Sequence, residues 1–188
     1  MKLLFPFAKR FIAGESLDKA SEQIQSLHHK GFRVAVNLVG EQSKSTDEAF
    51  IAQKEYLRIL DLFQTDKISL SIKPSMFGLS LSLVEALGFL KPITAKAFES
   101  GQTIRLDMED SSTTDNTIKL CQLLNQEFPN VMGITMQSNL YRTRDDLQRL
   151  KSQNISIRLV KGAYRENKEI AFMASYEIKD NFILLAND

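Results

Sequence analysis

Residues 155–164 of the chain are ISIRLVKGAY. This stretch is apolar or β-branched at four positions: Ile155, Ile157, Leu159 and Val160. Apolar side chains on both faces are typical of an interior strand of a parallel sheet. Arg158 lies in the middle of this run, and a guanidinium is costly to bury without an anionic partner. Two partners are open: a ligand with phosphate or electron-rich ring oxygens, or a structural carboxylate under a loop.

The composition is that of an ordinary globular domain. The 188 residues are 43% hydrophobic and 25% charged, with a formal net charge of +1, which allows one domain with a substantial core. This charge balance argues against a nucleic-acid-binding surface. The single cysteine, Cys121, excludes an internal disulfide and a cysteine-based metal cluster. The adjacent His28 and His29 indicate a polar helix end, so we expect no metal site.

The N-terminal stretch MKLLFPFAKRF is briefly apolar, but Pro6, Lys9 and Arg10 interrupt it. It is too short for a secretory signal with a cleavage site, and no other stretch approaches the length of a membrane span. We therefore expect a cytoplasmic protein, or at most one peripheral to a membrane.

Strand-like and helix-like segments alternate along the chain. Strands are predicted over residues 32–39, 67–72, 103–106, 131–136 and 155–160. Helices are predicted over residues 16–30, 46–63, 115–128 and 141–151, and from residue 169 onward. Within residues 79–100, Gly88 and Pro92 predict a short helix, a turn and a second helix. This alternation is typical of parallel α/β folds.

Polar residues recur where the predicted strands end. They are Glu41, Lys73, Asp107, Gln137 and the stretch 158–164. In a (β/α) barrel these ends form one mouth, where the active site lies. A doubly wound sheet would need a glycine-rich phosphate loop after its first strand, and LVGEQS does not supply one. The sequence therefore predicts a TIM-type (β/α) barrel, incomplete because a closed barrel has about eight strands and only five are predicted.

Five motifs carry a family resemblance: GEQS, SIKPS, RLDMEDS, GITMQSNL and IRLVKGAY. In this order and spacing they resemble the flavin-dependent proline dehydrogenases, as do RFIAGES and ENKEIAF at either end of the series. The resemblance covers nearly all of the chain. It implies a single partial barrel domain over residues 1–188 with a helical lead-in over about residues 1–31. It also implies FAD at the mouth and oxidation of L-proline to 1-pyrroline-5-carboxylate, the first step of proline catabolism, by hydride transfer to the flavin, with a quinone-type electron acceptor.

The resemblance also implies a role for each mouth residue. Asp107 and Arg158 would be the catalytic residues, with Arg158 near the flavin N5 and O4 edge, stabilising the charge that builds on reduction. Lys73 would hold the substrate carboxylate, and Tyr164 would wall the pocket. The expected flavin contacts are Met108, Gln137, Arg158, Val160, Lys161, Gly162 and Ala163.

Each assignment has a structural alternative. Lys73 would otherwise be a solvated strand-end lysine, Asp107 a helix N-cap and Glu109 an exposed neighbour. Gln137 would satisfy a backbone group, and the methionines would fill the core.

The family's remaining strands and closing helix would follow Asp188. By the resemblance, those segments grip the FAD phosphates and clamp the proline carboxylate, so we do not expect this chain alone to be a working dehydrogenase. A truncated or split gene, a piece of a longer product, and a half that needs a complementing chain are all open. So are a non-catalytic binding or assembly module, an oligomer formed through exposed sheet edges, and a different flavin barrel.

Overall fold

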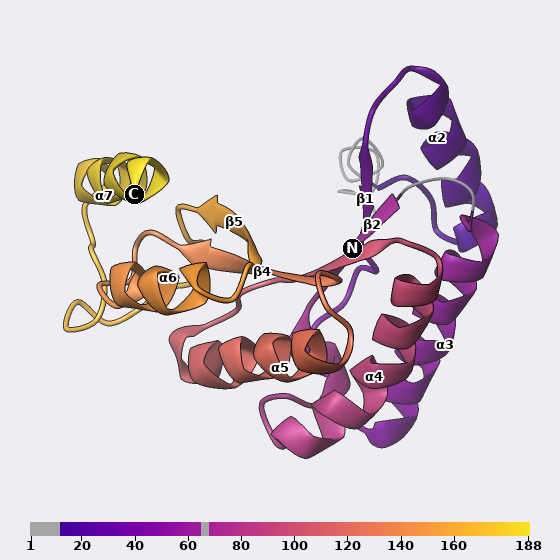
Figure 1. The fold of residues 1–188 in the computed structure, drawn as a ribbon, viewed down its shortest axis with the longest axis horizontal. Coiled ribbons are helices and arrows are strands. Elements are labelled where there is room, and N and C mark those ends of the chain that lie inside the picture. The colour runs from indigo at the N-terminus through magenta and orange to yellow at the C-terminus, as the bar shows by residue number, and fades with distance from the viewer. Residues whose placement is uncertain (1–11, 65–67) are drawn as a thin grey trace, which may run out of the picture.

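The structure is a computed structural model that describes residues 12–64 and 68–188. Its centre is a five-stranded parallel sheet in the order β1-β2-β3-β4-β5. The strands are β1 Val34–Val36, β2 Ile68–Ile72, β3 Thr103–Leu106, β4 Met132–Gln137 and β5 Ser156–Val160. The sheet curls into an incomplete barrel, as expected (Figure 1).

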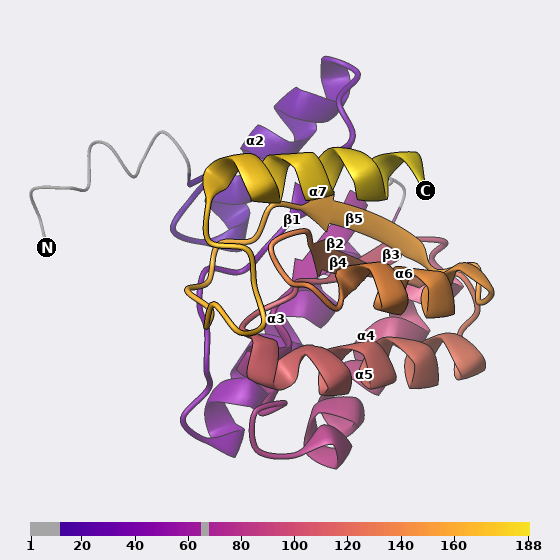
Figure 2. The ribbon, with the colours of Figure 1, turned by 90° about the vertical axis from the view of Figure 1, so that its left-hand side faces the viewer.

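Helices connect the strands and cover the outer side of the curl (Figures 1 and 2). They are α2 Leu17–His29, α3 Thr46–Leu62, α4 Leu83–Glu99, α5 Thr114–Glu127, α6 Thr143–Lys151 and α7 Ser175–Asn187. Two short 3-10 helices, η1 Pro74–Phe77 and η2 Ser111–Thr113, follow β2 and β3. No helix in the described ranges is both long enough and apolar enough to cross a bilayer.

Serine N-caps begin three of the helices. The side chains of Ser16, Ser45 and Ser82 each accept a hydrogen bond from the backbone amide three residues later. This satisfies a donor that the first helical turn leaves without a partner. The predicted helices over residues 16–30 and 46–63 are confirmed on this basis. Residues 1–11 of the predicted lead-in lie outside the described residues.

The predicted break within residues 79–100 is wrong. Leu83–Glu99 forms one continuous helix, α4, with Pro92 inside it. Proline at this position removes the hydrogen bond to the carbonyl of Gly88, four residues earlier. Both residues lie on the exposed side of α4, where water can bind the freed carbonyl. The buried side of α4 continues unbroken through Ala86, Leu90, Ile93, Thr94 and Ala97.

The prediction of an interior strand at residues 155–160 is also wrong for the described sheet, because β5 pairs with β4 alone. All five β5 residues are exposed or partly exposed. β1 is shorter than predicted, with three residues, and the last helix begins at Ser175 rather than at residue 169.

The two faces of the sheet differ in chemistry. The outer face packs on the helices and is fully buried at Leu70, Ile72, Ile104, Leu106, Ile134 and Met136. Side chains alternate between the faces along a strand, so the inner face carries Ser69, Ser71, Thr103, Arg105, Gly133, Thr135, Ser156 and Arg158. The apolar core therefore lies between sheet and helices, and the polar residues line the inside of the curl.

Candidate active site

The sheet brings several of the predicted site residues together. Lys73 follows β2, Asp107 follows β3, Gln137 ends β4, and Arg158 lies in β5. Because all five strands are parallel, their carboxyl ends lie along one rim. Two ion pairs form on this rim, Arg158 with Asp107 and Lys73 with Glu41.

The pair between Arg158 and Asp107 crosses the inner face from β5 to the end of β3. Ser71 Oγ donates to the same Asp107 oxygen, Oδ1, at 2.7 Å, and Arg158 Nε donates to Thr135 Oγ1 at 3.1 Å. Of the two partners open for the arginine, the structure thus shows a carboxylate. The Arg158 side chain is still 41% exposed, against 17% for Asp107, so the guanidinium also faces the interior of the curl.

Lys73 is held by a carboxylate rather than only by water. Its Nζ pairs with Glu41 Oε1 from the loop after β1. An ammonium that already binds one carboxylate at the rim has the chemistry to bind another that replaces it. Lys73 is therefore not the freely solvated strand-end lysine that its structural alternative describes.

Glu109 is buried, at 5% exposure, and is not the exposed neighbour given as the alternative. Its carboxylate accepts hydrogen bonds from the backbone N and the Oγ of Ser75, at 2.8 and 2.5 Å. Burial raises the pKa of Glu109 above its ordinary value, while the two bonds from Ser75 oppose that rise. The carbonyl oxygen of Glu109 accepts from Gln137 Nε2 at 2.8 Å, so Gln137 satisfies a backbone group, as its structural alternative proposed.

The loop after β5 turns at Gly162, which has a φ of +103°. A Cβ at this position would lie 2.2 Å from Oδ1 of Asn139. Asn139 also donates its backbone N–H to Lys161 O at 3.0 Å and accepts from Phe172 N at 2.8 Å. Glycine is therefore required here both by the backbone conformation and by the side chain packed beneath it.

Tyr164, in the same loop, is partly buried beside the acidic side of the mouth. Burial, together with the smaller effect of nearby carboxylates, raises the pKa of Tyr164 to about 12. These carboxylates are Glu41, Glu109, Asp110 and Asp107. The phenol therefore lies close to the groups around Lys73, which is consistent with a pocket wall.

The residues expected to contact a flavin fall into two groups. Lys161 and Ala163 are exposed on the loop, and Val160 and Gly162 are partly exposed. Met108 and Gln137 are buried beneath the mouth, and Met108 belongs to the apolar core. The exposed group together with the half-exposed Arg158 guanidinium offers cationic donors and a close backbone approach, and this donor set fits the oxygen- and nitrogen-bearing rim of a flavin.

Several residues that hold the mouth together were not identified from the sequence. They are Ser71, Ser75, Thr135, Asn139 and Glu166. Glu166 accepts from the backbone N and Oγ of Ser111, at 2.8 and 2.6 Å, and so ties the β5 loop to the β3 loop. A hydroxyl on the inner face of a strand, one or two residues before the strand ends, is the signal that could have pointed to Ser71 and Thr135.

A curled parallel sheet of βα units with paired charges at the carboxyl ends of its strands defines the class: an incomplete (β/α) barrel of the enzyme type. The family model for proline dehydrogenase matches residues 20–179. The chain therefore belongs to the proline dehydrogenase family.

Relatives and solved structures agree with this assignment. Proline dehydrogenase 1 of Bacillus subtilis is 30% identical over 167 residues, covering 88% of this chain and 55% of the relative. Proline dehydrogenase of Deinococcus radiodurans is 31% identical over 189 residues, covering 95% and 60%. Proline utilization A from Bdellovibrio bacteriovorus has the same fold, with a TM-score of 0.87 at 23% identity, over 98% of this chain and 24% of that one. The chain thus spans somewhat more than half the length of these curated relatives.

Proposed function

We propose that this chain supplies the proline-binding and flavin-facing residues of an FAD-dependent proline dehydrogenase, acting on L-proline with a quinone-type electron acceptor. The observation that carries the proposal is the pairing of two cations at one rim, Lys73 with Glu41 and Arg158 with Asp107, in a chain of this family. The proposal treats residues 1–188 as one partial barrel domain, with the lead-in over about residues 1–31.

In this proposal Lys73 binds the substrate carboxylate, which takes the place of Glu41. Tyr164 walls the pocket beside it. FAD, when bound, accepts the hydride from the substrate. It would be held by Arg158, Val160, Lys161, Gly162 and Ala163, with Met108 and Gln137 supporting them from below.

Arg158 and Asp107 are the proposed catalytic pair. Asp107 and Thr135 fix the guanidinium through hydrogen bonds from two neighbouring strands. A fixed positive charge that faces the reacting centre stabilises negative charge as it develops, without having to reorient. Asp107 acts through Arg158 by holding it in place.

The test is the visible spectrum of the purified chain after incubation with excess FAD and desalting. A chain that carries out the hydride transfer on its own would retain a flavin band that L-proline bleaches under anaerobic conditions. Lys73→Met should retain the band and lose the bleaching, because it removes only the ammonium group that binds the substrate carboxylate. Arg158→Met should weaken both. A wild-type chain that retains no flavin would exclude the chain alone as the working unit.

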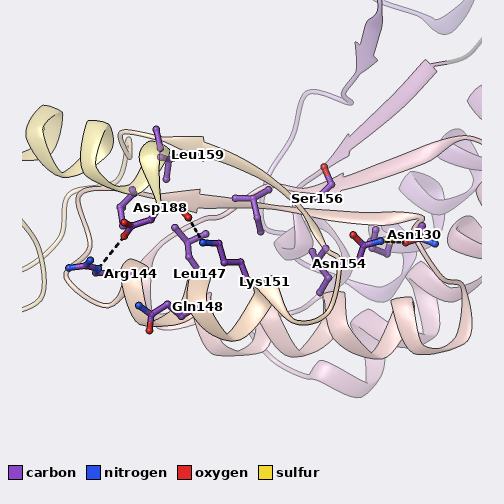
Figure 3. Close-up of a pocket in the computed structure, with 14 residues that line it drawn as sticks. Asn130, Arg144, Leu147, Gln148, Lys151, Asn154, Ser156, Leu159 and Asp188 are labelled. Carbon is purple, nitrogen blue, oxygen red and sulfur yellow. Dashed lines mark hydrogen bonds and ion pairs between the residues drawn. The ribbon is translucent and has the colours of Figure 1, made fainter.

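In a second candidate function, this chain is one half of a barrel that another chain completes. A hollow on the outer side of β5 favours it. A hollow of about 760 Å³ lies among α6, β5 and α7 (Figure 3). Ile157, Leu159 and Leu185 contribute apolar surface to it, and Ile157 is 36% exposed. The occupant we propose is a βα unit: a strand that pairs in parallel with β5, followed by a helix whose apolar side fills the hollow.

Co-expression tests this second function. The partner would be the part of Bacillus subtilis proline dehydrogenase 1 that this chain does not cover. Co-purification of the two pieces, with proline-dependent flavin bleaching that neither piece shows alone, is expected. Ile157→Asp should abolish co-purification, whereas Ile183→Asp, on the exposed side of α7, should not. Failure to co-purify would exclude complementation.

A further inference from the structure

Glu109 lies at the centre of the hydrogen bonds that join the mouth loops. Its carboxylate accepts two bonds from Ser75 in η1, after β2. Its carbonyl accepts one from Gln137 at the end of β4. Glu109, in the loop after β3, therefore fixes the ends of both neighbouring strands, β2 and β4.

Ser75 extends these contacts to the loop after β1. Gln42 donates its backbone N–H to Ser75 Oγ at 3.0 Å, and Ser43 donates its backbone N–H to Ser75 O at 3.2 Å. Gln42 directly follows Glu41. Ser75 therefore holds the backbone next to Glu41, and Glu109 in turn holds Ser75.

The same contacts determine the position of Lys73. Met76 N donates to Lys73 O at 3.1 Å, which closes the first turn of η1, and Ser75 lies inside that turn. Fixing Ser75 therefore fixes the backbone from which the Lys73 side chain leaves β2. Both partners of the Glu41–Lys73 pair are anchored in this way to one buried carboxylate.

We propose that Glu109 is the positioning residue for Lys73, holding the ammonium where a substrate carboxylate replaces Glu41. A carboxylate suits this role better than an amide, because both oxygens accept and the hydrogen bonds are charge-assisted. The proposal rests on the proposed function for the identity of the carboxylate that Lys73 binds. The position of Lys73 itself can be measured without any activity.

The first test measures how fast each lysine of the full chain reacts with an amine-acylating reagent, by mass spectrometry of its peptides. Glu109→Ala should raise the labelling rate of Lys73 on the order of fivefold, because the hydrogen bonds that fix the turn are lost. Glu109→Gln, which keeps an acceptor for Ser75, should recover part of the protection. The exposed Lys119 and Lys179 serve as internal references. Glu99→Gln, an exposed glutamate at the far end of α4, is the matched control and should change nothing.

A structural role alone predicts a different result. If Glu109 only stabilised the fold, Glu109→Ala would raise the labelling of all buried and paired lysines together, including Lys96, which pairs with Asp61 on the helical side. That result, or an unchanged rate at Lys73, overturns the proposal. A rise confined to Lys73 supports it.

The second test uses the dependence of flavin bleaching on L-proline concentration. Glu109→Ala should raise the half-saturating concentration about tenfold and lower the maximal rate less. A larger loss of maximal rate than of apparent affinity overturns the proposal. If the wild type shows no bleaching, the proposed activity of the chain alone fails, while the labelling result still decides whether Glu109 positions Lys73.

Discussion

The outer and inner faces of the sheet are made from alternate residues of the same strands, yet they have opposite chemistry. In β3, Ile104 and Leu106 are buried against the helices, whereas Thr103 and Arg105 face the inside of the curl. Burial of apolar surface is the main favourable term in folding. Exposed or half-exposed ion pairs add little net stability. Stability therefore resides mainly on the outer face, and the chemistry of the mouth on the inner one.

The largest effect that would separate the two faces is expected for Leu106→Ala. Leu106 is completely buried, and removing such a side chain leaves a cavity that costs roughly 2–5 kcal/mol. Urea unfolding followed by circular dichroism measures this. Thr103→Ala on the inner face of the same strand is the matched control, with an expected cost within about 1 kcal/mol. Equal costs for the two variants would contradict the separation of the faces.

A smaller effect is expected for Gly162→Ala, in the loop that carries the exposed residues proposed to contact the flavin. The positive φ and the contact with Asn139 both oppose a Cβ, at a cost of roughly 1–3 kcal/mol. In the Gly162→Ala protein, adding Asn139→Ala should recover the stability lost to the steric contact. The stability lost to the positive φ should not be recovered. Thermal unfolding of the four proteins of this double-mutant cycle gives the coupling. Strict additivity would show that the Asn139 contact is unimportant.

The smallest effect concerns pH and Glu109. Its folded-state pKa is raised above the ordinary value of 4.5, chiefly by burial, with Glu41 raising it and Lys73 lowering it. The folded state then binds the proton more tightly than the unfolded state. The stability contributed by Glu109 is therefore greatest below pH 4.5 and falls as the pH rises through the folded-state value.

Glu109→Gln isolates this contribution, because an amide does not titrate. The free energy of unfolding of the wild type, relative to Glu109→Gln, should fall as the pH rises from below 4.5 through the folded-state pKa of Glu109 and then level off. Urea titrations of both proteins across this range measure the difference. A relative stability that rises with pH would mean that the hydrogen bonds from Ser75 outweigh burial.

The alternation of strands and helices could be predicted because it depends on local periodicity and caps. The rim residues Lys73, Asp107 and Arg158 could be located because parallel strands place their ends together. The continuity of α4 could not, since it depends on Gly88 and Pro92 both facing solvent. Nor could the burial of Glu109, whose partner Ser75 lies 34 residues away, or the fit of Gly162 over Asn139. These are contacts between loops, and no local pattern encodes them.

The order of the strands in the sheet is the same as their order along the chain. Each βα unit consequently forms its strand pairings with the units that precede and follow it, as in a repeat protein whose stability is a sum of nearest-neighbour interfaces. In such a topology strand pairing can propagate from any adjacent pair of units. A run of consecutive units keeps all of its internal interfaces whatever its length. The charged rim adds contacts between units that are not neighbours, because Arg158 of β5 reaches across β4 to Asp107 after β3.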